Sequence, residues 1–144
     1  MHKYKILEKI AIADIAFEAY GKDYNELFEN SAQAIFEMAV DIKTLKNKIK
    51  KEISLEAETI ENLLYDFLSE ILFLKDAEQL IFLKCRVKIE KKVNKKILLK
   101  AEFFGDLINP ETQKLENDIK AITMHMFRIE NFKEGYKATV VVDI

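Results

Sequence analysis

Residues 60–72 carry the pattern that most constrains how this chain folds. Apolar side chains recur there at helical spacing, at Ile60, Leu63, Leu64, Phe67, Leu68, Ile71 and Leu72. A stripe this broad predicts a helix that begins after Thr59, and we expect it to be the most buried helix of the chain. A second helical pattern follows Asp23, which is spaced with Glu26 like a capping box. It predicts a helix over residues 24–39.

Alternating apolar and polar residues predict strands around these helices. The expected strands are 4–7, an extended piece from 10 to 21, 50–57, 79–90, 96–104, one long strand over 118–132, and 136–143. The order strand-helix-strand-helix followed by a strand meander indicates an α+β fold, with two helices and an antiparallel or mixed sheet. With one Pro and three Gly the chain has no flexible linker, so residues 1–144 are expected to form a single domain.

Composition excludes several classes of protein. The net charge of −2 argues against a general nucleic-acid coat, and we expect no strong direct RNA binding, although a local basic patch would be compatible with this charge. The single cysteine, Cys85, excludes an internal disulfide and makes a zinc cluster a poor fit. Residues 1–9 lack the apolar run of a signal peptide, and no segment approaches membrane-spanning length. A cytoplasmic location without membrane association is expected.

Two acidic features are candidates for chemistry. Asp14 interrupts the apolar run 10–17, so its carboxylate should lie near the core and need a cation, hydrogen-bond donors or a proton. It could equally cap a bend between two strands. At the other end of the chain, Asp143 and the terminal carboxylate of Ile144 place two anions side by side, which repel unless a cation lies between them. Hard cations such as calcium bind such oxygens, but both groups could simply be solvated.

Lys120 and His125 lie in one largely apolar segment, and each has an ordinary structural explanation as well as a functional one. A lysine on a strand usually points to water, and a lone histidine there is usually a satisfied structural residue. Only His2 and His125 offer imidazoles, and we find no nucleophile elbow and no Gly-rich phosphate loop. Catalytic triads and zinc sites are therefore poorly supported.

Taken in order, blocks of this sequence resemble the archease family. The blocks are Ala13-Asp14-Ile15-Ala16 with Ala19-Tyr20-Gly21, Leu27 to Ala32, Asp66 to Phe73, Glu102 to Gly105, Asp118 to His125, and the terminal Val142-Asp143-Ile144. The resemblance covers essentially the whole chain. No single block is specific, but their ordered set is. Two blocks depart from the family pattern: Ala11 and Ile12 replace a His-Thr pair, and Met124 replaces a tyrosine.

The resemblance implies a function and a site. Archeases are accessory proteins of the RtcB-type RNA ligase of tRNA splicing, and they promote its guanylylation and turnover. The family's metal site matches Asp14, Asp143 and Ile144, and its activity-linked lysine matches Lys120. The implied cofactor is a divalent metal, calcium first, with magnesium or manganese as alternatives. The chain is then an activator, with no catalytic residue of its own.

Two alternatives to ligase activation stay open. The family is also linked to tRNA cytosine methyltransferases, for which the chain would act as a chaperone-like modulator. A protein of a different class, a small metal-dependent hydrolase, could use Asp14 and Asp143. The sequence offers no convincing general base or nucleophile close to these two residues, which counts against the hydrolase.

Overall fold

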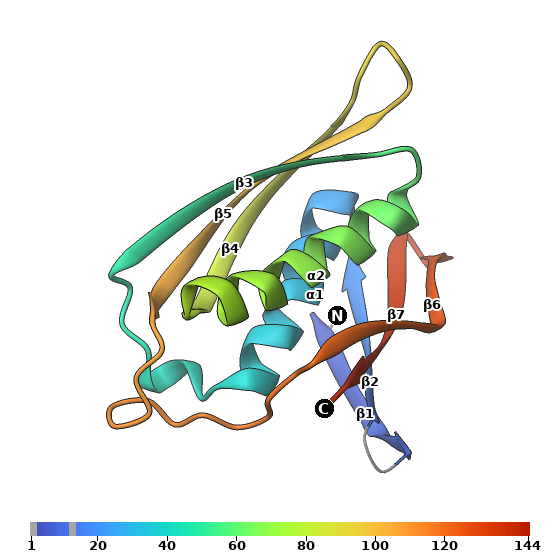
Figure 1. The fold of residues 1–144 in the computed structure, drawn as a ribbon. Helices are drawn as coiled ribbons and strands as arrows, with labels where there is room; N and C mark the ends of the chain where they lie inside the picture. The colour runs from blue at the N-terminus through green and yellow to red at the C-terminus, as the bar shows by residue number, and fades with distance from the viewer. Residues whose placement is uncertain (1–2, 12–13) are drawn as a thin grey trace.

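The structure is a computed structural model that describes residues 3–11 and 14–144 (Figure 1). In chain order its elements are β1 (Tyr4–Ala11), β2 (Asp14–Gly21), α1 (Tyr24–Ala39), the short 3-10 helix η1 (Ile42–Thr44), β3 (Ile49–Ala57), α2 (Ile60–Glu78), β4 (Leu80–Lys91), β5 (Ile97–Leu107), β6 (Ala121–Phe132) and β7 (Gly135–Asp143). The strands form two antiparallel sheets, a four-stranded one in the order β1-β2-β7-β6 and a three-stranded one in the order β3-β5-β4. The α+β prediction is confirmed, with the meander divided between two sheets.

The two helices lie between the sheets, and each contacts strands of both (Figure 1). The capping-box prediction for α1 is confirmed, because the Asp23 carboxylate accepts a hydrogen bond of 2.8 Å from the backbone N–H of Glu26. The expectation that α2 is the more buried helix is wrong. Most of α1 is buried because it packs on β2 and β4 at once, whereas α2 keeps an exposed face that includes Phe73. In the part of the chain that the structure describes, neither helix is long and apolar enough to cross a membrane.

Four phenylalanines form the centre of the core. Phe103 of β5 stacks on Phe82 of β4 with ring centroids 4.9 Å apart and on Phe67 of α2 at 5.7 Å. Phe36 of α1 meets Phe82 and Phe103 edge-on. Offset and edge-to-face contacts of this kind add to the hydrophobic effect of burying the rings. The cluster ties both helices to the inner face of the three-stranded sheet.

A β-bulge in β4 interrupts the simple alternation of its two faces. Strict alternation would place Phe82 on the same face as Lys84, but Phe82 is buried and Lys84 is exposed on the other face. The register with β5 shifts between these two residues, Phe82 pairing with Gly105 and Lys84 with Phe104. The extra residue reverses the alternation. A Cβ on Gly105 would lie only 2.0 Å from the Ile81 carbonyl oxygen, so this position needs glycine.

Helix α1 covers the free edge of β4 with three polar side chains spaced four residues apart. Asn25 accepts a hydrogen bond from the Ile89 N–H at 2.8 Å, Glu29 accepts one from the Val87 N–H at 2.9 Å, and Gln33 donates one to the Leu83 carbonyl at 3.1 Å. Burial raises the pKa of Glu29, and the Val87 N–H opposes this shift. An exposed strand edge invites pairing with other chains. The helix therefore satisfies backbone groups that would otherwise recruit another strand.

Strand β6 differs most from its prediction. The expected strand begins at 118, but β6 begins at Ala121, and it lies at the edge of its sheet. Its register with β7 is interrupted between Thr123 and Arg128, where Met126 adopts a left-handed backbone with φ of 55°. The excursion pushes His125 out to solvent. Its expected role as a satisfied structural histidine is therefore wrong.

Candidate functional site at the open end of the four-stranded sheet

The first and last acidic candidates lie directly opposite each other. Asp14 opens β2, Asp143 closes β7, and the two are cross-strand partners in an unbroken antiparallel register that runs to Gly21 and Tyr136. Directly opposed residues point to the same face of a sheet, with Cβ atoms about 4.5–5.5 Å apart. The sequence separates these carboxylates by almost the entire chain. The β2·β7 register brings them together.

Asp14 lies on the face of β2 that points away from the helices. The alternate residues Ile15, Phe17 and Ala19 belong to the core cluster, whereas Asp14 is half-buried. The expectation that its carboxylate lies near the core is therefore wrong, because the apolar run spans both faces of the strand. The alternative, that Asp14 caps a bend between two strands, concerns residues 12–13, which lie outside the described residues. Asp14 also pairs with Ala11, the last residue of β1.

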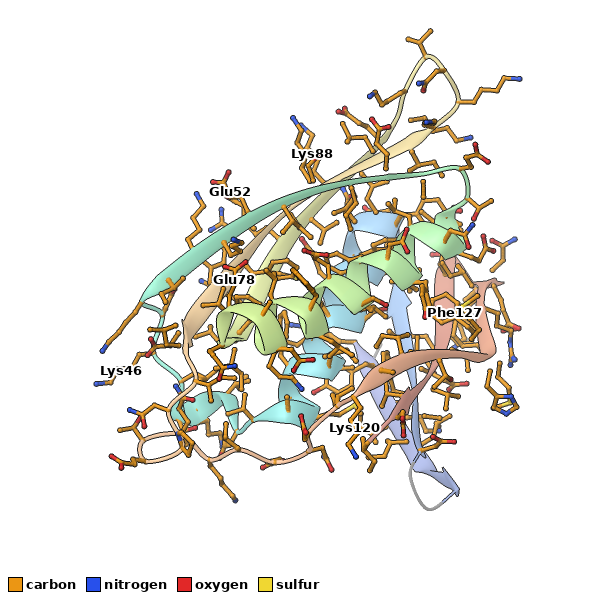
Figure 2. The ribbon with its side chains drawn as sticks, viewed as in Figure 1. Lys46, Glu52, Glu78, Lys88, Lys120 and Phe127 are labelled. Carbon is orange, nitrogen blue, oxygen red and sulfur yellow. The ribbon has the colours of Figure 1, made fainter. Side chains whose placement is uncertain are left out.

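Lys120 lies beside this carboxylate pair. Its backbone N–H donates a hydrogen bond of 2.8 Å to the Asp143 carbonyl, and the following residue, Ala121, is the partner of Asp143 in β6. Its side chain is exposed, where the 108–120 connection enters β6 (Figure 2). Ile144 follows Asp143 directly. Asp14, Asp143, Ile144 and Lys120 thus share one end of the sheet, next to the C-terminus in Figure 1.

Sequence reasoning missed Lys75 of α2, which anchors the chain just before Lys120. Its ammonium donates to the Asp118 carboxylate at 2.8 Å and to the Ile119 carbonyl at 2.9 Å, and its side chain is 15% exposed. The contact lowers the pKa of Asp118. Lys75 is the sole basic residue in the acidic stretch 52–78. That isolation is the signal that could have found it.

The oxygen donors at this end fit a hard divalent cation in kind. Calcium takes six to eight oxygens from carboxylates, carbonyls and water, and this end offers the two aspartates and the terminal carboxylate. Within residues 3–11 and 14–144 no cluster of three or more His, Cys, Asp or Glu side chains has metal-binding geometry. A cation here would depend on the terminal carboxylate and on water for the rest of its coordination.

The other groups considered from the sequence lie apart from this end. Cys85 is half-buried in β4, and burial raises its thiol pKa far above the ordinary range. A thiol held in its neutral form is a poor nucleophile and metal ligand. His2 lies outside the described residues. The prediction that zinc and triad chemistry are poorly supported is unchanged.

Comparison with known proteins identifies the family. The model of the Archease protein family matches residues 4–144. The chain belongs to the archease family. Archeases from Methanosarcina acetivorans and Pyrococcus furiosus are 37% and 38% identical to it, covering 99% and 92% of this chain and 96% and 93% of their own length. The archease of Sulfurisphaera tokodaii is 35% identical over the full length of both chains.

Solved structures show that the archease fold is shared. The solution structure of protein 1598 from Methanobacterium thermoautotrophicum superposes with a TM-score of 0.83 at 30% identity, over the full length of both chains. A crystal structure of an archease from Thermotoga maritima gives a TM-score of 0.61 at 24% identity, over 96% of this chain and 98% of that one. The predicted resemblance is confirmed. Among the residues that depart from the family pattern, Ile12 lies outside the described residues.

Proposed function

We propose that this archease activates an RtcB-type RNA ligase in tRNA splicing, by promoting guanylylation of the ligase and its turnover. The proposal combines membership of the family with the site at the end of the four-stranded sheet. It makes the chain an activator with no reaction of its own, acting in the cytoplasm on a partner enzyme.

One observation carries the proposal. Two carboxylates from opposite ends of the chain are direct cross-strand partners, and the backbone of Lys120 is hydrogen-bonded to one of the same residues. Like charges opposed across strands are destabilising. Since the β2·β7 register makes Asp14 and Asp143 neighbours, their placement costs stability unless a cation offsets it. A functional role explains why the cost is tolerated.

The residues at this end of the sheet have two separate roles in the proposal. Asp14, Asp143 and the Ile144 carboxylate would hold a divalent cation, which supplies positive charge at the tip of the sheet. Calcium is the first choice for oxygen ligands, with magnesium and manganese as alternatives. Lys120 extends into solvent beside them and presents a compact positive charge suited to a phosphate or a carboxylate in the partner's site. We name the four residues together the terminal site.

The test is a guanylylation assay with the purified cognate ligase. Wild-type protein should accelerate guanylylation, and protein extended beyond Ile144 should lose this effect, because the extension converts the terminal carboxylate into a neutral amide. The same extension placed before Met1 is the matched control and should retain activation. Equal activation by both tagged proteins would contradict the role of Ile144.

A chaperone-like modulator of a tRNA cytosine methyltransferase is the second candidate. The Thermotoga maritima archease is described as a possible chaperone, which supports testing a chaperone role for this chain. Light scattering of the methyltransferase during heating would separate the two roles. Suppressed aggregation that persists in an Asp143→Asn variant, without any effect on the ligase, would support the chaperone instead.

The terminal site gives no support to the third candidate, a small metal-dependent hydrolase. Lys120 and the carboxylates of the terminal site are exposed or half-buried and show no nucleophile held beside a base. Incubation of the isolated protein with RNA and with simple phosphoesters tests it directly. Turnover that requires Asp14 and Asp143 would overturn the activator proposal.

A further inference from the structure

The outer face of the three-stranded sheet carries a set of cations that the terminal site does not use. Four basic side chains project from it, Lys84, Arg86 and Lys88 on β4 and Lys100 on β5, and we name them the outer cations. Lys88 extends away from both helices in Figure 2. Three of them line a shallow groove of about 550 Å³ together with Glu52, Ser54 and Glu102.

Three acidic side chains on this face, Glu52, Glu56 and Glu102, are paired with other lysines, and Glu90 adds an exposed negative charge on β4. Lys50 bridges Glu102 at 2.8 Å and Glu52 at 3.1 Å, and Lys92 pairs with Glu56. Among the described residues, none of the outer cations forms an ion pair within 4.0 Å of a carboxylate. The groove therefore presents positive charges without a close carboxylate partner, although Arg86 lies opposite Glu102 in the register of β4 and β5. An anionic ligand would complement it.

An aromatic ring lies among these cations. Phe104 sits half-buried on the central strand β5, with the Lys84 ammonium 5.2 Å and the Arg86 guanidinium 5.5 Å from its ring centroid. Arg86 is one of only two arginines in a chain with 21 lysines. Aromatic faces and guanidinium planes both stack on nucleic-acid bases. An acidic polypeptide would use the charges but has no base to stack on this platform.

We propose that the outer cations and Phe104 form a weak binding face for single-stranded RNA. Residues two apart on a strand recur every 6.4–6.8 Å, so Lys84, Arg86 and Lys88 form a row of charges along which a phosphate backbone can run. The open face with its exposed ring suits a single strand, because only unstacked bases can lie on an aromatic side chain. Phe104 with Arg86 stacks a base. This face belongs to the three-stranded sheet, whereas the terminal site lies at one end of the four-stranded sheet.

The test measures binding of a fluorescent single-stranded RNA of about ten nucleotides to the isolated protein by anisotropy. Three or four phosphate contacts predict that affinity falls about 20–50-fold between about 50 and about 200 mM salt. The double variant Arg86→Ala/Lys88→Ala removes two contacts, so affinity at low salt should fall at least about fivefold and the log–log salt slope by about 1.4. Phe104→Leu should cost about fivefold through lost stacking.

The double variant Lys43→Ala/Lys46→Ala is the matched control, because it removes the same charge from an exposed segment distant from this face (Figure 2). It should bind as the wild type does. Absence of binding at low salt, equal loss in the control, an unchanged Phe104→Leu affinity, equal affinity for duplex RNA, or equal competition by polyglutamate would each overturn the proposal. Melting curves of every variant confirm folding. Because no ligase is present, the result is independent of the proposed function.

Discussion

The four-stranded sheet joins strands from opposite ends of the chain, whereas β4 and β5 of the three-stranded sheet pair across the short turn at 92–96. The register of the first is broken in both edge strands, between Ile6 and Ala11 and between Thr123 and Arg128. The second has one bulge and otherwise pairs residue by residue. The four-stranded sheet, which we call the long-range sheet, contains the acidic candidates. The three-stranded sheet, which we call the local sheet, supplies the aromatic core and a charged outer face. The terminal site of the proposed function lies where distant segments meet.

The largest expected effect tests whether the local sheet anchors the fold. Phe103→Ala removes the ring at the centre of the aromatic cluster, so the free energy of unfolding should fall by about 3–5 kcal/mol. Phe104→Ala, its neighbour on the outer face, should cost under about 1 kcal/mol. Urea unfolding followed by circular dichroism measures both. Similar losses at the two positions would show that the faces of this sheet are not distinct.

The second prediction concerns the end of the long-range sheet. Calcium at about 100 times its dissociation constant should stabilise the protein by about 2.7 kcal/mol, because it binds the folded state. Asp143→Asn should abolish the rise in melting temperature, whereas Glu52→Gln on the local sheet should leave it unchanged. Thermal melts with calcium, then with a chelator, give the readout. An unaltered calcium response in Asp143→Asn would remove Asp143 from the site.

Lys75 sharpens the comparison, because it joins α2 to the start of β6. Lys75→Met should cost about 1–2 kcal/mol, since it breaks hydrogen bonds from a mostly buried charge to Asp118 and Ile119. Lys51→Met breaks a more exposed pair, between Lys51 of β3 and Glu78 at the end of α2, and should cost at most about 1 kcal/mol. Denaturant unfolding compares the two variants. Equal costs would mean that Lys75 is an ordinary surface lysine.

The smallest effect is a pH dependence at the same contact. Lys75 lowers the pKa of Asp118 in the folded protein, so the stabilisation is present above the ordinary aspartate range. It is lost as the pH falls below about 4, through the folded pKa. Asp118→Asn should lack this loss, and its stability should converge with that of the wild type in acid. Stability curves between neutral and acid pH that stay parallel would contradict the assignment.

Local patterns predicted much of the fold. The helix over 24–39, its Asp23 cap and the β4–β5 hairpin appear within a few residues of their expected bounds, because helical spacing, capping and short turns act between near neighbours. The deeper burial of α1 and the division into two sheets depend on tertiary packing. The bulge after Phe82 depends on the Gly105 contact, which lies in a different strand.

The terminal site could be predicted only in part. Chain-end chemistry suggested that Asp143 and Ile144 act together, and the family resemblance added Asp14 and Lys120. The exact opposition of Asp14 and Asp143 follows from the β2·β7 register, which no local pattern specifies. Lys75 stands out as the sole basic residue of 52–78, but its partners Asp118 and Ile119 lie in a distant segment that no local pattern connects to it.

We propose that the terminal site acts on a ligase, whereas the local sheet maintains the fold. The most direct test measures guanylylation of the cognate RNA ligase with wild type, Lys120→Ala and the matched Lys100→Ala, an exposed lysine of the local sheet. Surface changes usually alter stability by no more than about 0.5 kcal/mol, so all three should melt alike. Lys120→Ala should lose activation, and Lys100→Ala should retain it. Full activation by a normally folded Lys120→Ala would contradict the proposal.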